Sequence, residues 1–154
     1  MHVLHHIAVE ADSAEEANNI VQALLDDGFF AWSDWSTIGG SRFEARTINY
    51  AENEKEFLAR LARSRHNRAT EVAEMLEGLD ISKVIEELQN YNGQNELGFD
   101  HWRLKNAFRI ATGSSVSGAY FFDTVEYCTS DEYLIKRLEI EPKTQYLVPV
   151  DFHF

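Results

Sequence analysis

The opening residues of this chain constrain its fold most strongly, because they combine a strand pattern with a complete helix signal. Apolar and polar side chains alternate over residues 2–10, which predicts a strand with one mostly apolar face. Ser13 and Glu16 then form a capping box, and apolar residues at helical spacing continue as far as Gly28, a typical stop residue. We therefore expect a helix over about 14–27 and a fold that mixes α and β structure.

Four further strands are predicted along the chain. Segments 29–38 and 42–49 are separated by a glycine pair, which is typical of a hairpin. Strand patterns also occur in segment 117–128 and in the last segment, 145–154. Pro149 removes a backbone hydrogen-bond donor from the last strand, so we expect this strand to lie at a sheet edge or to carry a bulge.

The stretch between these strand regions is helical. Residues 53–78 repeat apolar side chains at helical spacing, but Arg65 and Arg68 fall on the same face. Arginine is rarely buried without a partner, so either the helix breaks near Ser64–Asn67 or the two guanidinium groups point inward toward carboxylates or a ligand. We favour the break, because Ser-Arg-His-Asn is a weak helix sequence.

Three more helices are predicted. Two of them cover about 82–91 and 100–112, and in the second helix Trp102 and Phe108 are expected to be core residues. A short helix over 131–139 precedes the last strand.

Together these elements predict one α+β domain over residues 1–154. The chain has 154 residues and 44% hydrophobic residues, which is enough for a substantial core without disulfides or metals. The element order β-α-β-β, then helices, then β-α-β favours a ferredoxin-like sheet with a helical insertion at about 52–112.

The net charge of −12 argues against a general binder of nucleic acid or of anionic membranes. The charge is uneven, because residues 55–70 carry five bases and one acid between two acidic blocks. The bases of this island are Lys55, Arg60, Arg63, Arg65 and Arg68. Such a run is most often a solvated helix face paired with neighbouring glutamates, and a ligand site is the alternative.

Familiar chemical motifs are absent. The patterns for dinucleotides, phosphate loops, zinc proteases, calcium loops and hydrolase nucleophile elbows do not occur, so we predict no cofactor and do not favour an enzyme. Cys128 is the single cysteine, which favours a reducing compartment, and we rank a core position above a nucleophile paired with His101 or His66. With no leader pattern and no membrane-spanning segment, we expect a cytoplasmic protein that does not bind membranes.

The two ends of the chain form one candidate site. If the first and last strands pair antiparallel, strand parity places His2 and His6 beside Asp151 and His153 on one polar outer face. Imidazoles and a carboxylate are suitable ligands for a borderline metal such as zinc. The alternative is a merely polar outer face, which we favour.

The segment WSDWSTIGGSRF is a second candidate site, because tryptophan faces, a glycine pair and an arginine fork suit a small anionic ligand. The alternative is a hairpin with core tryptophans. Its candidate residues are Trp32, Asp34, Trp35, Gly39, Gly40 and Arg42, with Arg65 and Arg68 added from the basic island.

This segment is similar to a W-D-W-x-x-I-G-G-R-W pattern in uncharacterised small proteins of bacteriophages and related mobile elements, where it also follows a strand and a helix. Here Ser41 separates the glycines from Arg42, and Phe43 stands in place of the final tryptophan. The resemblance implies a phage or mobile-element origin, and therefore a small accessory protein that binds a host protein in stoichiometric amounts.

Three functions follow in order of preference. The first is a non-enzymatic acidic binding protein, an inhibitor of a host nucleic-acid-handling or defence protein with a basic surface, although acidity that serves solubility alone is the alternative. The second is a protein that binds a small phosphate-bearing ligand or nucleotide through Trp32, Trp35, Arg42 and the island of residues 60–68. The third is a metal-dependent enzyme, and self-association is left open. The acidic side chains expected on helix surfaces are Glu15, Glu16, Asp26, Asp27, Glu71, Glu74, Glu77, Glu86 and Glu87.

Overall fold

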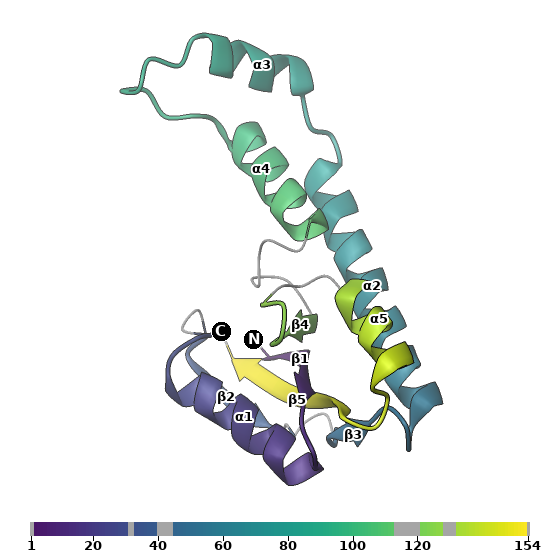
Figure 1. The fold of residues 1–154 in the computed structure, drawn as a ribbon. Helices are drawn as coiled ribbons and strands as arrows, with labels where there is room; N and C mark the ends of the chain where they lie inside the picture. Colours follow the sequence, from purple (N-terminus) through teal and green to yellow (C-terminus); the bar gives the residue numbers. More distant parts are fainter. Residues whose placement is uncertain (1, 31–32, 40–44, 113–120, 128–131, 154) are drawn as a thin grey trace.

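A mixed sheet with helices on both faces forms the body of the protein, and a helical arm projects from it (Figure 1). The computed structural model describes residues 2–30, 33–39, 45–112, 121–127 and 132–153. The elements in chain order are β1 (His2–Glu10), α1 (Ala14–Asp26), β2 (Trp35–Ile38), β3 (Ile48–Asn49), α2 (Glu54–Leu76), α3 (Ile81–Gln89), α4 (Phe99–Ala111), β4 (Phe121–Asp123), α5 (Glu132–Ile140) and β5 (Gln145–His153). The α+β class is therefore confirmed.

The centre of the sheet is the antiparallel pair β1 and β5, which runs in register from His2 opposite His153 to Glu10 opposite Gln145. This pairing of the chain ends was predicted. The sheet order is β2-β5-β1-β4, with β3 also paired to β5 and with β1 and β4 parallel. The prediction that the last strand lies at an edge is wrong, because β5 has partners on both sides.

Pro149 is accommodated inside the sheet by its position along β5. Its carbonyl oxygen accepts a hydrogen bond from the N–H of Gly39 at 2.8 Å, so its missing N–H faces the same side. On that side β2 pairs with residues 150–153 and β3 with residues 146–147. Pro149 therefore lies between the two paired stretches, where no ladder donor is lost.

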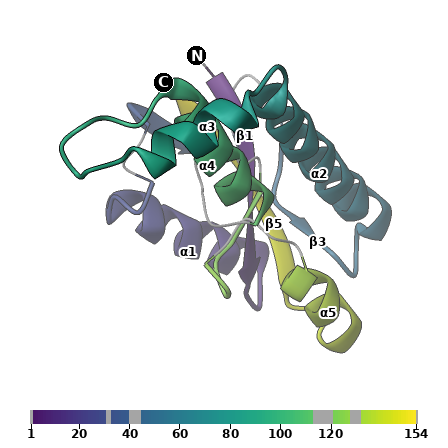
Figure 2. The ribbon, with the colours of Figure 1, turned by 90° about the horizontal axis from the view of Figure 1, so that it is seen from above.

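Helices cover both faces of the sheet, with α1 on one face and α2 and α5 on the other (Figure 2), and each face carries its own apolar core. On one face Ala17 and Val21 of α1 pack on Val148 and Val150 of β5, together with Phe122. The other face is covered by apolar side chains of α2 and α5, which pack on Ala8, Ile48 and Leu147. These covering residues are Phe57, Leu61, Leu134 and Leu138. Both faces of strand β5 are therefore buried.

The ferredoxin-like arrangement is not confirmed. The expected hairpin of segments 29–38 and 42–49 does not form among the described residues, because β2 and β3 each pair with β5. The last strand thus enters the sheet between β1 and the segments that were expected to pair with each other. Residues 40–44 lie outside the described part of the chain.

Helix α2 is continuous from Glu54 to Leu76, so the predicted break near Ser64–Asn67 is wrong. Ser64, inside the predicted break, is one of the buried residues of α2. Arg65 is exposed and Arg68 is half-buried, so neither guanidinium group requires a helix break.

The arm consists of residues 79–111, which contain α3 and α4. It is joined to the end of α2 by Arg103 of α4, which donates hydrogen bonds to the backbone carbonyls of Glu74 and Glu77. Within the arm, the N–H of Gly98 donates to Glu87 at 2.9 Å, which links α4 to α3. The insertion of helices predicted at about 52–112 therefore corresponds to α2 and this arm.

The expectation that Trp102 and Phe108 are core residues is wrong. Trp102 is 51% exposed and Phe108 is 69% exposed. Helix α4 contacts α2 through its other face, where Ala107 and Ile110 are buried. None of the described helices has the length and apolar content to span a membrane.

A buried ion pair joins α5 to the sheet. Arg137 donates to Asp123 at 2.5 Å, and Asp123 is fully buried. The same carboxylate accepts from the N–H of Val125 at 2.9 Å. These contacts satisfy a charge that would otherwise be costly to bury.

Candidate functional site

The outer surface of α1 and its flanks is acidic. Residues 10–28 contain six carboxylates and no basic residue. All six side chains belong to exposed residues, and within the described part of the chain none forms an ion pair. They are Glu10, Asp12, Glu15, Glu16, Asp26 and Asp27. We call these six residues the α1 acidic surface.

The two ends of α1 differ in what their carboxylates do for stability. At the start, the N–H of Glu16 donates to Ser13 Oγ at 3.1 Å, and the N–H of Asp12 donates to Glu16 at 2.7 Å, as a capping box predicts. At the end, Asp26 and Asp27 lie beside the negative pole of the helix, where carboxylates are unfavourable. Asp26 is partly compensated by a hydrogen bond from Gln22 Nε2 at 2.8 Å, so it is Asp27 whose position helix stability does not explain.

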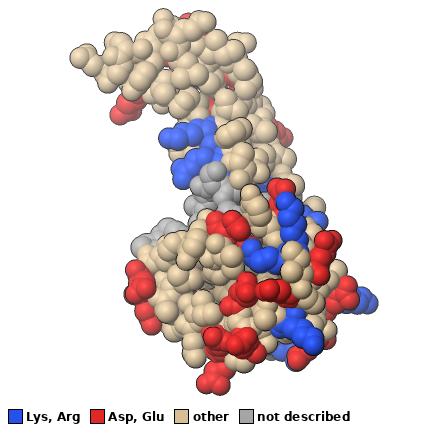
Figure 3. All heavy atoms as spheres, in the orientation of Figure 1, with Lys and Arg blue, Asp and Glu red and all other residues tan. Residues whose placement is uncertain are grey.

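The charge is concentrated on the body and not on the arm (Figure 3). The arm, residues 79–111, has five acidic and four basic side chains, so its net charge is −1 and the rest of the chain carries −11. Figure 3 shows many acidic side chains over the body, whereas this face of the arm is mostly uncharged. Of the two acidic blocks in the sequence, residues 1–54 lie on the body, whereas residues 71–100 lie on the end of α2 and on the arm, where basic residues of α4 offset their charge.

The structure brings together residues from both candidate sites that the sequence indicated. His2, Trp35 and His153 occupy one cross-strand row. The ring of Trp35 is stacked on that of His153, with centroids 5.2 Å apart, and His2 lies edge-on to both rings. His2 Nδ1 is 3.0 Å from the buried carboxylate of Asp151, and His153 Nδ1 is 3.4 Å from Asp34.

This row does not support the metal-site hypothesis. His6 lies on the same face but is buried near Arg60 and Arg63 of α2, and no contact between it and Asp151 is found. Among the residues that the structure describes, no three histidine, cysteine or carboxylate side chains are grouped to hold a metal ion. The predicted polar outer face is also wrong, because His6 and Asp151 are buried.

Burial keeps two neighbouring histidines neutral. Desolvation lowers the pKa of His5 to about 4. For His6, desolvation and then the positive charges of Arg60 and Arg63 lower the pKa to about 3. These side chains are core components of β1, and sequence parity alone did not reveal that the helices cover them.

The proposed small-ligand set is only partly described. Trp32, Gly40 and Arg42 lie outside the described residues, whereas Asp34 and Trp35 are exposed near His153. Gly39 has a φ of +82°, which suits glycine at the end of β2. Arg65 and Arg68 lie on α2, and no described contact joins them to Trp35.

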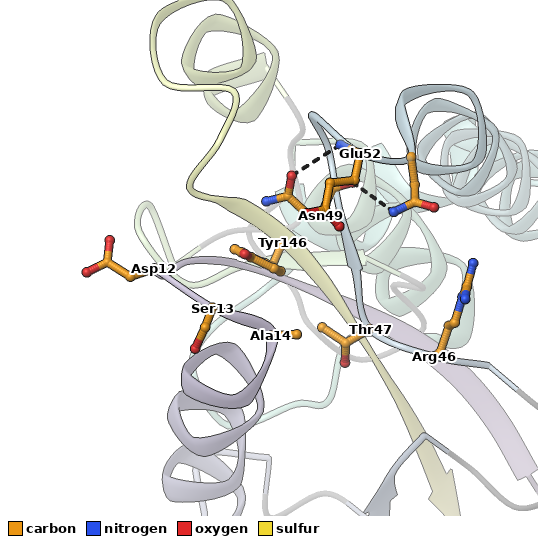
Figure 4. Close-up of a pocket in the computed structure, with 9 residues that line it drawn as sticks. Asp12, Ser13, Ala14, Arg46, Thr47, Asn49, Glu52 and Tyr146 are labelled. Atoms are coloured by element: carbon orange, nitrogen blue, oxygen red, sulfur yellow. Dashed lines mark hydrogen bonds between the residues drawn. The ribbon is translucent and has the colours of Figure 1, made fainter.

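A pocket of about 520 Å³ lies elsewhere, between the start of α1, β3 and the start of α2 (Figure 4). Asn49 is at its centre and accepts from the N–H of Glu52 at 3.3 Å, while Asp12 and Arg46 lie at opposite edges. The remaining lining residues are Ser13, Ala14, Thr47, Asn53 and Tyr146. No sequence motif indicates this pocket, because its lining comes from four separate segments of the chain.

Other candidate groups are less well placed for chemistry. Glu71 lines a second pocket with Glu74, and burial followed by the Glu74 charge raises the pKa of Glu71 to about 7. Cys128 lies outside the described residues, His66 is exposed and His101 is half-buried. Arg60 of the basic island pairs with Glu56 at 2.6 Å and donates to the backbone carbonyl of Arg46, but its side chain is only 11% exposed, so the prediction of a solvated helix face is wrong for this residue.

Comparison of the chain with models of known protein families, with curated proteins and with solved structures gives no match. The class that the fold itself defines is an α+β domain with an acidic body and a helical arm.

Proposed function

We propose that this chain is a non-enzymatic binding protein that acts stoichiometrically on another protein through the α1 acidic surface. The observation that carries the proposal is the set of six exposed carboxylates on residues 10–28, with no basic residue among them. The unfavourable position of Asp27 at the end of α1 adds support, because binding would explain what helix stability does not.

The partner that this surface fits is a protein with a basic groove. Carboxylates spaced along a helix can occupy positions that phosphates take when such a groove binds nucleic acid. The target would then be a nucleic-acid-handling or defence protein of the host, in line with the phage-like segment at residues 32–43. Inhibition by this route requires occupancy alone and no chemical step.

The α1 surface is a better candidate than α5. Residues 132–143 at α5 combine three carboxylates with three basic side chains, so the negative electrostatic potential of the carboxylates is largely cancelled. Lys136, for example, lies 3.7 Å from Glu132. A basic partner is therefore attracted more strongly to α1 than to α5.

Capture from a lysate of the host cell tests the proposal. The wild-type chain should retain a protein at about 50 mM salt and release it at about 500 mM, because the Debye length shortens from roughly 14 Å to roughly 4 Å. Double-stranded DNA added to the lysate should compete for the same protein. Retention that is insensitive to both salt and DNA would contradict the proposal.

A second candidate function is binding of a small polar ligand in the pocket of about 520 Å³. Its volume lies within the usual range for ligand sites, and exposed Arg46 at its edge suits an anionic group. A thermal-shift panel of nucleotides and other phosphates tests it. A rise in melting temperature that is lost in Arg46→Gln would support the pocket, and no rise with any compound would remove this candidate.

A further inference from the structure

The arm exposes an unusual amount of apolar surface. Seven large apolar side chains on residues 79–111 are between 47% and 70% exposed. These residues are Ile81, Ile85, Leu88, Tyr91, Phe99, Trp102 and Phe108. An aromatic side chain has roughly 150–250 Å² of surface, so the four aromatic residues alone expose on the order of 400 Å². The aliphatic residues add to this area, which is divided between faces because Phe108 lies on the opposite side of α4 from Phe99 at 100° per residue.

The apolar residues are organised along the helices. On α3, Ile81, Ile85 and Leu88 recur at helical spacing and are about half exposed, whereas Val84 is buried. On α4, the rings of Phe99 and Trp102 are stacked with centroids 5.5 Å apart. The arm therefore presents ordered apolar faces, which the rest of the described chain does not cover.

We infer that this apolar surface of the arm binds the same surface of a second copy of the chain. The distribution of charge favours a like surface, since the arm has a net charge of only −1 while the rest of the chain carries −11. A basic partner is attracted to the body, whereas a nearly neutral, apolar arm is best matched by another neutral, apolar surface. A two-fold axis brings identical patches together and closes the assembly.

The area and the shape agree with this occupant. A stable interface buries about 800 Å² on each partner, which is comparable with the apolar surface of the arm and its polar rim. The arm projects away from the sheet (Figure 1), so pairing through the arms keeps the two acidic bodies apart. The assembly would carry two α1 acidic surfaces.

Sedimentation equilibrium of the full chain tests the inference. We expect a dimer, and Ile85→Gln should weaken it by at least about tenfold, because each substitution removes the side chain from both copies. Phe99→Gln should act in the same way. The matched control is Ile140→Gln on α5, which changes an equally apolar, 75% exposed side chain outside the arm and should leave the dimer unchanged.

The salt dependence of the dimer and amide hydrogen exchange distinguish a weakened dimer from a variant that is partly unfolded. Raising the salt concentration should preserve or tighten the dimer, because it screens repulsion between acidic bodies, whereas it should weaken binding of a basic partner. Amide protection should rise with protein concentration on residues 81–111 alone. A chain that stays monomeric at about 100 μM, or a dimer that Ile85→Gln and Phe99→Gln do not weaken, would overturn the inference.

Discussion

At the scale of single residues, the contact between Arg137 and Asp123 makes the sharpest stability prediction. Arg137→Gln leaves a fully buried carboxylate without its cation, so we expect the free energy of unfolding to fall by about 3 kcal/mol. Urea unfolding at pH 7 measures this loss. The control is Lys136→Gln, whose side chain is exposed beside Glu132 and should change stability by less than about 0.5 kcal/mol. Equal effects of the two substitutions would contradict the account.

His6 makes a prediction about pH. Burial and nearby arginines lower the pKa of His6 from 6.5 to about 3 in the native chain. Between about pH 3 and pH 6.5, His6 therefore binds a proton in the unfolded chain but not in the native chain. The stability present above about pH 6.5 is therefore lost as the pH falls. Between pH 6.5 and pH 5 the wild type should lose unfolding free energy, and His6→Leu should lose about 2 kcal/mol less of it. Parallel pH curves would disprove this role.

At the scale of elements, α1 should respond in opposite directions when its two ends are neutralised. Asp26→Asn with Asp27→Asn removes charges from the negative end of the helix, and we expect a gain of up to about 1 kcal/mol. Glu15→Gln with Glu16→Gln, at the positive end, should lower stability by a similar amount. Thermal unfolding of the two double variants provides the comparison, and shifts of the same sign would exclude the helix-dipole explanation.

The elements also show how far the sequence alone leads. β1, α1 and β5 were predicted within one residue of their observed ends, because alternation and capping are local signals. The continuity of α2 was missed because burial of the small residue Ser64 depends on packing. Pro149 was misjudged because its tolerance depends on the gap between β2 and β3, which are distant in sequence.

The candidate site could be predicted only where the alternation of side chains along a strand decides which residues share a face. Alternation along β1 and β5 correctly placed His2 near Asp151 and His153. The contact of Trp35 with both histidines depends on β2 pairing with the end of β5, which no local pattern indicates. The exposure of Trp102 depends on how little of α3 and α4 the body covers, so helical spacing alone suggested the opposite.

At the scale of the whole molecule, charge and apolar surface are separated in space. The body carries −11 and exposes the α1 acidic surface, whereas the arm is nearly neutral and exposes apolar side chains. Two binding modes with opposite salt dependence follow from this separation. Association through the body should weaken as salt rises, and association through the arms should persist.

The most direct test of the central claim is the affinity of the captured partner for two charge-matched variants. One replaces Asp26 and Asp27 with asparagine, and the other replaces Glu139 and Glu141 with glutamine. Both change the net charge from −12 to −10 at the end of a helix, on α1 and α5 respectively. Titration calorimetry at about 50 mM salt should show affinity reduced by at least about tenfold for the α1 variant and nearly unchanged for the α5 variant. Equal losses, or no loss for the α1 variant, would contradict the claim that the α1 acidic surface is the binding site.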